Sequence, residues 1–403
     1  MKIELLAPAG DLEKLKIAVL YGADAVYLGG RHFGLRAGAG NFTESDLAEG
    51  VRFAHEQGVR VYVTVNIFAH NRDLAGLPAY LDMLCQVGTD AVIVSDPGVI
   101  GLIRRLYPAL PIHLSTQANT TNWAAARFWE ELGVRRIVLA RELSLPEISE
   151  IREQVALELE IFIHGAMCIS YSGRCLLSSY LTGRDANRGD CAQSCRWKYA
   201  LVEEKRPGEY FPIVEDNRGS YILGSKDLCL IEHIPELIGA GVSSFKIEGR
   251  MKSVNYVAGV VKAYREAIDA YSSDPDNYCF NPAWLKEIGK VSHRDYTTGF
   301  LFGSPGSAGQ HYAGEIYRRS HIFAGLIRDY ERNSGMAVVE QRNRFAVGDE
   351  VEIMVPRGES FRQRITRIID EQGQAVEAAP HPQQMVRVPV DRPTPDYSIL
   401  RKI

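Results

Sequence analysis

The chain has 403 residues, of which 46% are hydrophobic and 24% are charged, and its formal net charge is -4. This composition is typical of a soluble globular enzyme, and the length allows one large domain and a smaller one. No apolar run reaches the roughly 18–20 residues of a membrane span, and the opening MKIELLAPAG lacks the features of a signal peptide. We therefore expect a cytoplasmic protein with no membrane partner. A nucleic-acid partner would have to meet a local basic patch, because the chain has no overall positive charge.

The first 250 residues alternate short β-branched runs with amphipathic helical segments. The runs lie at 3–7, 24–30, 59–66, 90–96, 111–117, 135–141, 157–165 and 243–249. Nearly continuous apolar strands separated by helices are typical of a parallel sheet that is buried on both faces. Eight such units predict an α/β fold of the (β/α)8 TIM-like barrel type over residues 1–271.

A long insertion separates the seventh predicted strand from the eighth. It spans residues 166–242, much longer than an ordinary crossover, and contains five of the seven cysteines. It leaves the carboxyl end of a strand, the end at which barrel enzymes build their active sites. We therefore expect this cysteine-rich insertion to lie at the active-site face.

The composition and the hydrophobic pattern of the sequence change after the predicted barrel. Residues 272–310 are rich in Ser, Asp, Pro, Tyr and Gly and predict a linker with a little helix. Residues 311–403 alternate apolar and polar positions between turn sequences, which predicts a small antiparallel β-barrel domain.

Polar residues follow several predicted strands and would point into one pocket. A glycine-rich loop after the second strand adds Arg36, which could close over a ligand or lie in a surface turn. The cations of KIEGR suit an anionic ligand, with Arg giving a bidentate grip on a carboxylate. Alternatively, the strand ends are polar only because solvent reaches the mouth of the barrel, and the charges of KIEGR form a salt bridge from Glu248 to a neighbour. The candidate pocket residues are Arg36, Asn66, Gln117, His164, Lys246, Glu248 and Arg250.

The clustered cysteines have the spacing Cys168-x6-Cys175-x15-Cys191-x3-Cys195-x33-Cys229. A structural zinc site usually has two short pairs, and only one exists here. Iron–sulfur clusters tolerate irregular spacing, so five thiols on one insertion fit such a cluster well. A third interpretation is a cysteine nucleophile at Cys168 with His164 as its base, which leaves the other thiols without a role.

Basic and aromatic residues alternate on the same insertion. Arg and Lys bind phosphates, and exposed bases stack on aromatic rings. The candidates for RNA contact are Arg174, Arg184, Arg188, Arg196 and Trp197. The alternative is an ordinary solvated loop with aromatic anchors.

The segment EIFIHGAMCISYSGRCLLS (160–178) resembles the signature of the collagenase-like, U-type peptidase family. The resemblance extends over essentially the whole chain, through LAPAGDLEKLKIAVLYGADAVYLGG, NRGDCAQSCRWKY, SKDLC and FKIEGRMKS. Within the family, LSTQANTTNWAAARFW and SDPGVI are most similar to the prephenate-dependent tRNA hydroxylases.

This resemblance implies an enzyme that forms 5-hydroxyuridine at the wobble position of tRNA, with prephenate and a 4Fe–4S cluster. The implied cluster ligands are Cys168, Cys175, Cys191 and Cys229, with Cys195 as the rival for the fourth position. His164 and Glu248 would serve proton transfer, and the pocket cations would hold prephenate, a dicarboxylate. Alternatives are a cysteine- or metal-dependent peptidase, or a hydroxylase of another RNA or of a quinone precursor. A homo-oligomer is compatible with all of them.

Overall fold

The computed structural model describes most of the chain. The described residues are 3–34, 41–167, 176–186, 190–194, 197, 201–202, 210–211, 215–216, 219–220, 226–303, 305 and 318–403, with the backbone alone between 201 and 220.

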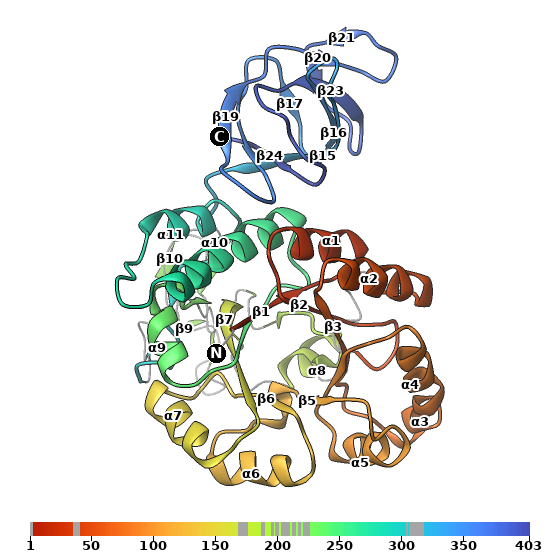
Figure 1. The fold of residues 1–403 in the computed structure, drawn as a ribbon, viewed down its shortest axis with the longest axis vertical. Coiled ribbons are helices and arrows are strands. Elements are labelled where there is room, and N and C mark those ends of the chain that lie inside the picture. Colours follow the sequence, from red (N-terminus) through yellow and green to blue (C-terminus); the bar gives the residue numbers. More distant parts are fainter. Residues whose placement is uncertain are drawn as a thin grey trace.

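Eight parallel strands close into a barrel (Figure 1). Each strand pairs with the next along the chain, and β13 pairs with both β7 and β1, which closes the ring. The strands are β1 (Glu4–Pro8), β2 (Ala25–Leu28), β3 (Arg60–Val65), β4 (Ala91–Val94), β5 (Ile112–Leu114), β6 (Arg136–Val138), β7 (Glu158–Ala166) and β13 (Ser244–Ile247). Nearly all of their residues are buried, as expected for a sheet covered on both faces.

Helices surround the strands on the outside of the barrel (Figure 1). They are α1 (Leu12–Leu20), α2 (Glu44–Glu56), α3 (Asn71–Leu74), α4 (Leu77–Gln86), α5 (Pro97–Leu106), α6 (Trp123–Glu131), α7 (Leu145–Gln154), α9 (Ile234–Gly239) and α10 (Val254–Ser273). Local sequence sets where several of them begin. At α2, for example, Thr43 and Asp46 form a capping box that satisfies the first backbone N–H groups.

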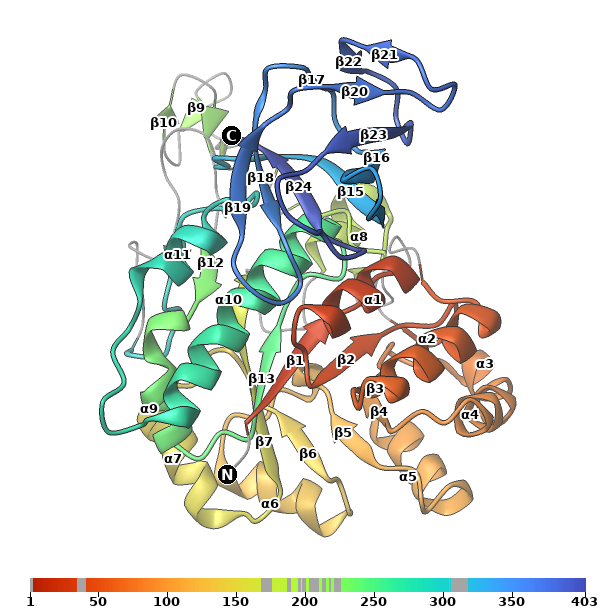
Figure 2. The same ribbon diagram turned by 45° about the horizontal axis from the view of Figure 1, so that its top comes forward.

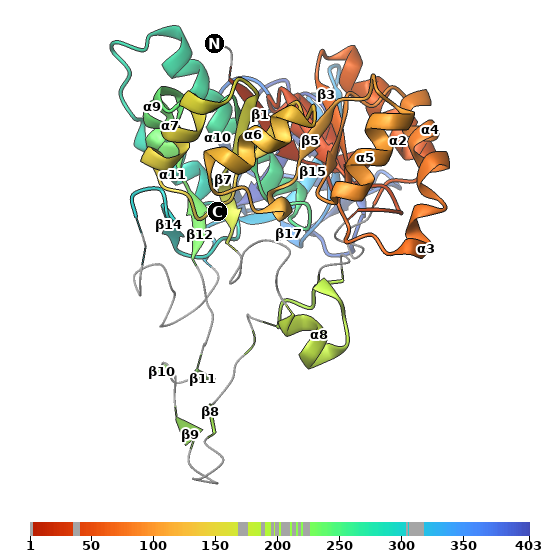
Figure 3. The same cartoon turned by 90° about the horizontal axis from the view of Figure 1, so that it is seen from below.

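The insertion projects from one side of the barrel. Figure 3 shows α8 (Leu177–Thr182) and the short strands β8 (Leu201–Val202), β9 (Tyr210–Phe211), β10 (Glu215–Asp216) and β11 (Gly219–Ser220) beyond the ring of helices. The chain rejoins the barrel before residue 242, because β12 (Asp227–Cys229) pairs antiparallel with the end of β7. A short helical turn, η4 (Ile231–His233), and α9 then lead into β13.

The segment from 272 to 310 contains regular structure that packs on the barrel. It holds the end of α10, α11 (Pro282–Ile288) and β14 (Tyr296–Thr297), and β14 pairs with β12. Arg294 lies between these elements, 1% exposed, and donates to Asp227 Oδ1 from its Nη2 at 2.6 Å. This ion pair fixes β12 beside β7.

The C-terminal domain is a curled antiparallel sheet with its own core. Eight strands form the sheet, and β17 and β22 form a separate pair. The strands are β15 (Ile322–Glu331), β16 (Met336–Gln341), β17 (Phe345–Ala346), β18 (Glu350–Met354), β19 (Phe361–Arg364), β20 (Ile368–Ile369), β21 (Ala375–Val376), β22 (Ala378–Ala379), β23 (Met385–Pro389) and β24 (Ile399–Lys402). The predicted architecture, a (β/α)8 barrel followed by a small antiparallel β domain, is confirmed.

The two domains meet along α1, α10 and α11 (Figure 2). Tyr21 on α1 donates from its hydroxyl to the Met354 carbonyl at 2.9 Å, and Lys262 on α10 donates to the Val355 carbonyl at 2.9 Å. Arg401 on β24 is fully buried and donates to Asn255 Oδ1 at 2.6 Å. Buried polar contacts of this kind hold the β domain in one orientation on the barrel.

Candidate active site at the barrel mouth

A network of charged side chains lies inside the barrel, near the amino ends of its strands. Glu160 on β7 is fully buried, and its Oε2 accepts from Arg136 Nη1 at 3.0 Å and from Ser244 Oγ at 3.1 Å. Arg136 also pairs with Glu4 on β1. Burial opposes ionisation of Glu160, but Lys246 and Arg136 outweigh it and hold its pKa at about 2. The carboxylate is therefore charged at neutral pH.

Lys246 links this network to the mouth of the barrel. Its Nζ donates to Glu160 Oε1 at 2.7 Å, and the ammonium also lies 4.6 Å from the centre of the Tyr27 ring and 5.4 Å from that of Phe162. Burial lowers the pKa of Lys246, and the Glu160 carboxylate partly offsets this. Lys246 thus forms a buried salt bridge with Glu160, and the predicted salt bridge from Glu248 to a neighbour stays a prediction.

Arg250 lies at the end of the KIEGR segment, over the carboxyl end of β2. It is 4% exposed and donates from Nη1 to Thr64 Oγ1 at 3.1 Å. A Cβ atom at Gly29 would lie 2.5 Å from Arg250 Nη1, so the guanidinium occupies space that only a glycine leaves open. The structure therefore brings two of the predicted anion-binding cations, Lys246 and Arg250, to the same end of the barrel.

Asn66 and Gln117 meet at this end, as predicted for two pocket residues. Asn66 Nδ2 donates to Gln117 Oε1 at 2.6 Å, and Ser115 Oγ donates to the same oxygen at 3.1 Å. Gln117 lies in a short turn, η1 (Thr116–Ala118), directly after β5. The contact joins the ends of β3 and β5 across the mouth. The third predicted cation, Arg36, lies outside the described residues.

His164 lies near the end of β7 and is 1% exposed. The rings of Tyr256, Tyr264 and Tyr296 surround it at centroid distances of 5.9, 5.5 and 5.5 Å. Burial lowers the pKa of His164 to about 3, so the imidazole is neutral at pH 7. Its predicted catalytic role stays a prediction, and any such role would start from the neutral ring.

Glu248 follows β13 and is half-buried. Its backbone N–H donates to the His164 carbonyl at 2.9 Å, and its own carbonyl accepts from the Tyr256 hydroxyl at 3.0 Å. Gly165 makes this close contact possible: its φ is +107°, and a Cβ there would lie 2.6 Å from the Glu248 carbonyl oxygen. The predicted pair of proton-transfer residues is thus adjacent in space, and its role stays a prediction.

Two of the predicted cluster ligands are described, and each sulfur lies within hydrogen-bonding distance of a donor group. The Gln193 N–H donates to Cys191 Sγ at 3.4 Å, and the Tyr264 hydroxyl lies 3.8 Å from Cys229 Sγ. Hydrogen bonds to sulfur stabilise thiolates that bind metals and tune iron–sulfur clusters. These two cysteines therefore fit ligands of a metal cluster.

Cys229 stands opposite His164 in the antiparallel pairing of β12 with β7. Burial raises the pKa of its thiol to about 11. A cysteine nucleophile needs a lowered thiol pKa instead, so that a thiolate lies beside a protonated imidazole. The other predicted ligands, Cys168, Cys175 and Cys195, lie outside the described residues, and within the part that is described no three His, Cys, Asp or Glu side chains form a metal site.

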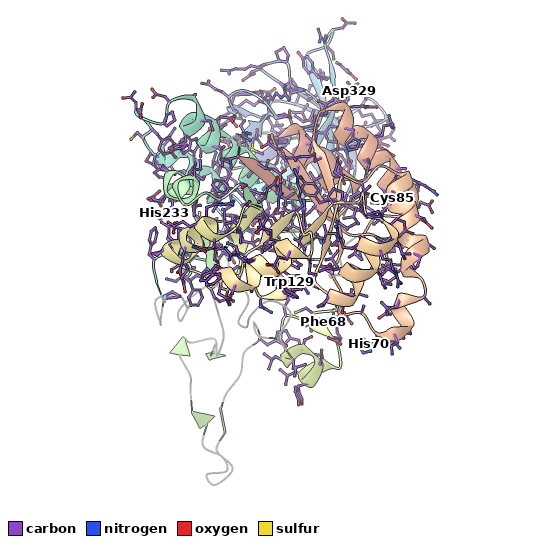
Figure 4. The ribbon with its side chains drawn as sticks, turned by 60° about the horizontal axis from the view of Figure 1, so that its bottom comes forward. Phe68, His70, Cys85, Trp129, His233 and Asp329 are labelled. Carbon is purple, nitrogen blue, oxygen red and sulfur yellow. The ribbon has the colours of Figure 1, made fainter. Side chains whose placement is uncertain are left out.

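The predicted RNA-contacting residues are only partly placed. Arg184 is paired with Asp190, with 2.7 Å between Nη2 and Oδ1, and Trp197 is 45% exposed. Arg174, Arg188 and Arg196 fall outside the described ranges. Phe68 and His70, which follow β3, lie on the same side of the barrel as α8 (Figure 4).

Two residues of the site were not predicted from sequence. Glu160 carries a signal in retrospect, because a carboxylate in the apolar strand LELEIFI must have a buried partner. Tyr264, whose hydroxyl lies 3.8 Å from Cys229 Sγ, ends a continuously buried stretch of α10, residues 254–264, and carries no such signal.

No helix in the described ranges is both long and apolar enough to span a bilayer.

Comparison with known proteins identifies the family. The model of Peptidase family U32 matches residues 10–311, and that of the Peptidase family U32 C-terminal domain matches residues 319–401. The tRNA hydroxylation protein P1 of Bacillus subtilis (strain 168) is 48% identical over 401 residues, 100% of this chain and 95% of that protein. The tRNA hydroxylation protein P of Escherichia coli (strain K12) is 40% identical over 431 residues, 96% of this chain and 94% of that protein.

A further relative is named for a different RNA. The 23S rRNA 5-hydroxycytidine synthase of Escherichia coli (strain K12) is 39% identical over 319 residues, 76% of this chain and 46% of that protein. Because the family models cover the barrel and the β domain and these identities extend over most of the sequence, the chain belongs to peptidase family U32.

Proposed function

We propose that this chain is a tRNA hydroxylase that forms 5-hydroxyuridine at the wobble position, with a 4Fe–4S cluster and prephenate at the barrel mouth. The observation that carries the proposal is its 48% identity, over its whole length, to a protein named for tRNA hydroxylation. The similarity to an rRNA 5-hydroxycytidine synthase supports the wider class of RNA hydroxylases. The polar groups at the carboxyl ends of the barrel strands provide the expected place for the chemistry.

The cluster would be held by Cys168, Cys175, Cys191 and Cys229. The donor groups beside the sulfurs of Cys191 and Cys229 support the place of these two residues in the set, and Cys195 is the rival for the fourth position. When bound, a cluster of this kind supplies one-electron transfer or a Lewis-acidic iron.

Prephenate would lie between the cations and the amides of the mouth. Arg250 and Lys246 supply positive charge for its carboxylates, with Arg36 as the third predicted cation. Asn66 and Gln117 would orient it through hydrogen bonds from the opposite strands. Glu248, half-buried at the edge of the mouth, is the proposed proton carrier, with His164 as the neutral imidazole behind it.

The uridine would enter from the side of the insertion. A base inside folded RNA must leave its stack to reach a barrel mouth, and the flipped base is usually held by stacking and by cations. Trp197, which is 45% exposed, and Arg184 are the proposed contacts among the described residues, and Arg174, Arg188 and Arg196 are the others.

The first test joins cluster content to tRNA modification. We expect anaerobically purified wild-type protein to be brown, with about four iron atoms per chain, and to restore 5-hydroxyuridine in tRNA from a deletion strain, measured by mass spectrometry. Cys229→Ser should lose both properties. The matched control is Cys85→Ser, an exposed cysteine on α4, which should keep both. A colourless wild-type protein, or tRNA that is unchanged by deletion once redundant pathways are removed, would overturn the proposal.

The second test addresses the anion site. We expect Arg250→Ala to weaken prephenate binding at least about tenfold in calorimetry, because the guanidinium would pair with a carboxylate of the ligand. The variant should retain the iron content of the wild type, because the proposed cluster ligands are cysteines. Arg105→Ala, an exposed residue near the end of α5, is the control and should bind as the wild type does. Equal affinities for the two variants would argue against Arg250 as a ligand of prephenate.

A further inference from the structure

The hydroxyl of Tyr264 reaches the sulfur of Cys229 from the middle of α10. Tyr264 is fully buried, and its oxygen lies 3.8 Å from Cys229 Sγ, a hydrogen-bonding distance for sulfur. The same oxygen lies 3.4 Å from His164 Nδ1. One hydroxyl therefore contacts both members of the cross-strand pair that joins β12 to β7.

Backbone contacts fix the position of this hydroxyl. The Leu230 N–H donates to it at 3.1 Å, and the hydroxyl donates to the Ile163 carbonyl at 2.8 Å. The Leu230 N–H also donates to the Ile163 carbonyl, at 2.9 Å. Because that carbonyl keeps the Leu230 donor, the tyrosine proton can turn from Ile163 to the sulfur without leaving a buried acceptor unsatisfied.

The neighbouring tyrosines do not share this arrangement. The Tyr256 hydroxyl donates to the Glu248 carbonyl at 3.0 Å, and the Tyr296 hydroxyl donates to the Ile288 carbonyl at 3.3 Å. Of the three tyrosines around His164, Tyr264 is thus the one whose hydroxyl contacts a sulfur in the described structure.

We propose that the Tyr264 hydroxyl donates a hydrogen bond to the sulfur of Cys229 when that sulfur is an iron ligand, and that this bond raises the reduction potential of the cluster. This inference rests on the proposed function, because it needs Cys229 as a ligand. One-electron reduction adds negative charge to the cluster and its sulfurs, so a fixed donor stabilises the reduced form more than the oxidised one. Tyr264 is a positioning residue in this scheme: its proton stays on the oxygen, and the electron comes from the external reductant.

The test compares two variants that each remove one buried hydroxyl from α10. Tyr264→Phe removes the contact with Cys229, and Tyr256→Phe removes a contact with a backbone carbonyl alone. Iron content is measured first, and the midpoint potential is then measured in a titration with dithionite followed by electron paramagnetic resonance. We expect Tyr264→Phe to retain the iron and to shift the potential to a more negative value, with about a fivefold lower ratio of reduced to oxidised cluster at a fixed potential, as a hydrogen bond of about 1 kcal/mol implies. Tyr256→Phe should keep the wild-type potential.

Equal potentials in the wild type and Tyr264→Phe would overturn the inference while leaving the proposed function intact. A wild-type protein without iron would overturn both. If Tyr264→Phe loses the cluster, the decisive measurement is made on protein labelled throughout with 3-fluorotyrosine. The fluorinated hydroxyl is a stronger donor, so we expect a less negative potential than in the unlabelled protein, and an unchanged potential would overturn the inference.

Discussion

The protein has two buried ionic clusters, one inside the barrel and one at the domain junction. They consist of the same types of side chain but have different roles. Inside the barrel, Arg136 lies between Glu4 and Glu160, and Lys246 caps the network toward the mouth. At the junction, Arg401 contacts Glu287 and Glu352. Both clusters are built on an almost fully buried arginine: Arg136 contacts three carboxylates, those of Glu4, Glu160 and Glu158, and Arg401 contacts two.

The clusters differ in how many cations share the carboxylates. At the junction, Lys290 Nζ lies 2.6 Å from Glu287 Oε2 and 2.9 Å from Glu352 Oε1, so a second cation contacts both acids. In the barrel, Arg136 bridges Glu4 and Glu160, and their second cations, Arg60 and Lys246, each contact one of the two acids. The barrel cluster also ends at the proposed active site, where Glu160 already balances the charge of Lys246. We infer that Lys246 is held in place by this network, so that its ammonium can orient an anion without moving.

The largest expected effect comes from removing Arg136. Arg136→Met leaves Glu4 and Glu160 in the barrel interior without their shared cation, and breaking a buried pair in this way costs about 3–5 kcal/mol. The free energy of unfolding in urea measures the loss. Arg60→Met is the control, because Arg60 contacts the same Glu4 from a position that is 52% exposed and should contribute at most about 1 kcal/mol. Equal losses would contradict the view that Arg136 organises the barrel interior.

The fold was more predictable from sequence than this network. Eight apolar runs separated by helical segments predict a barrel, because each run must be buried on both faces. The partners of Glu160 could not be predicted, since they come from β6 and β13, and only closure of the barrel brings both strands against β7. The same holds for Tyr264, whose contact with Cys229 depends on where β12 rejoins β7.

Removing the junction arginine should have a smaller effect. Arg401→Met deletes a charged donor to Asn255 and to the carboxylates, but Lys290 still neutralises Glu287 and Glu352. We expect a loss of about 1.5–3 kcal/mol, the range for hydrogen bonds to charged groups. Differential scanning calorimetry should show this loss, and limited proteolysis should cut the junction faster than in the wild type. A loss as large as that of Arg136→Met would mean that the second cation gives no protection.

The two clusters should also differ in their response to acid. His113 lies against Tyr62 in the barrel, with 4.6 Å between ring centroids, and His321 lies 4.0 Å from Glu352 at the junction. Burial lowers the pKa of both, and that of His113 well below 6.5. Below pH 6.5 the unfolded chain binds protons that the folded chain does not, so stability falls as the pH falls.

Of these two histidines, His113 should contribute more to this acid dependence. Between pH 6.5 and 5.0 each such histidine contributes a loss of at most about 2 kcal/mol, since one pKa unit corresponds to about 1.4 kcal/mol. His113→Phe keeps an aromatic ring against Tyr62 and should remove most of its share. His321→Phe should remove less, because the charge of Glu352 favours its protonation. The exposed His381→Gln should leave the dependence unchanged, and a wild-type slope in His113→Phe would contradict the expectation.

The smallest expected effect comes from Glu13→Gln, which removes a charge at the edge of the junction and keeps the size of the side chain. Glu13 on α1 faces a cleft of about 700 Å³ between the domains, where it contacts Arg328 and Arg342. Glu340 contacts both arginines as well, so Glu13→Gln leaves each of them with a carboxylate. We expect a loss of about 1 kcal/mol or less, screened further by salt, in urea unfolding at low and high ionic strength. A larger loss that is insensitive to salt would show that Glu13 acts through packing between the domains. A second carboxylate on each arginine would then give no protection at this edge of the junction.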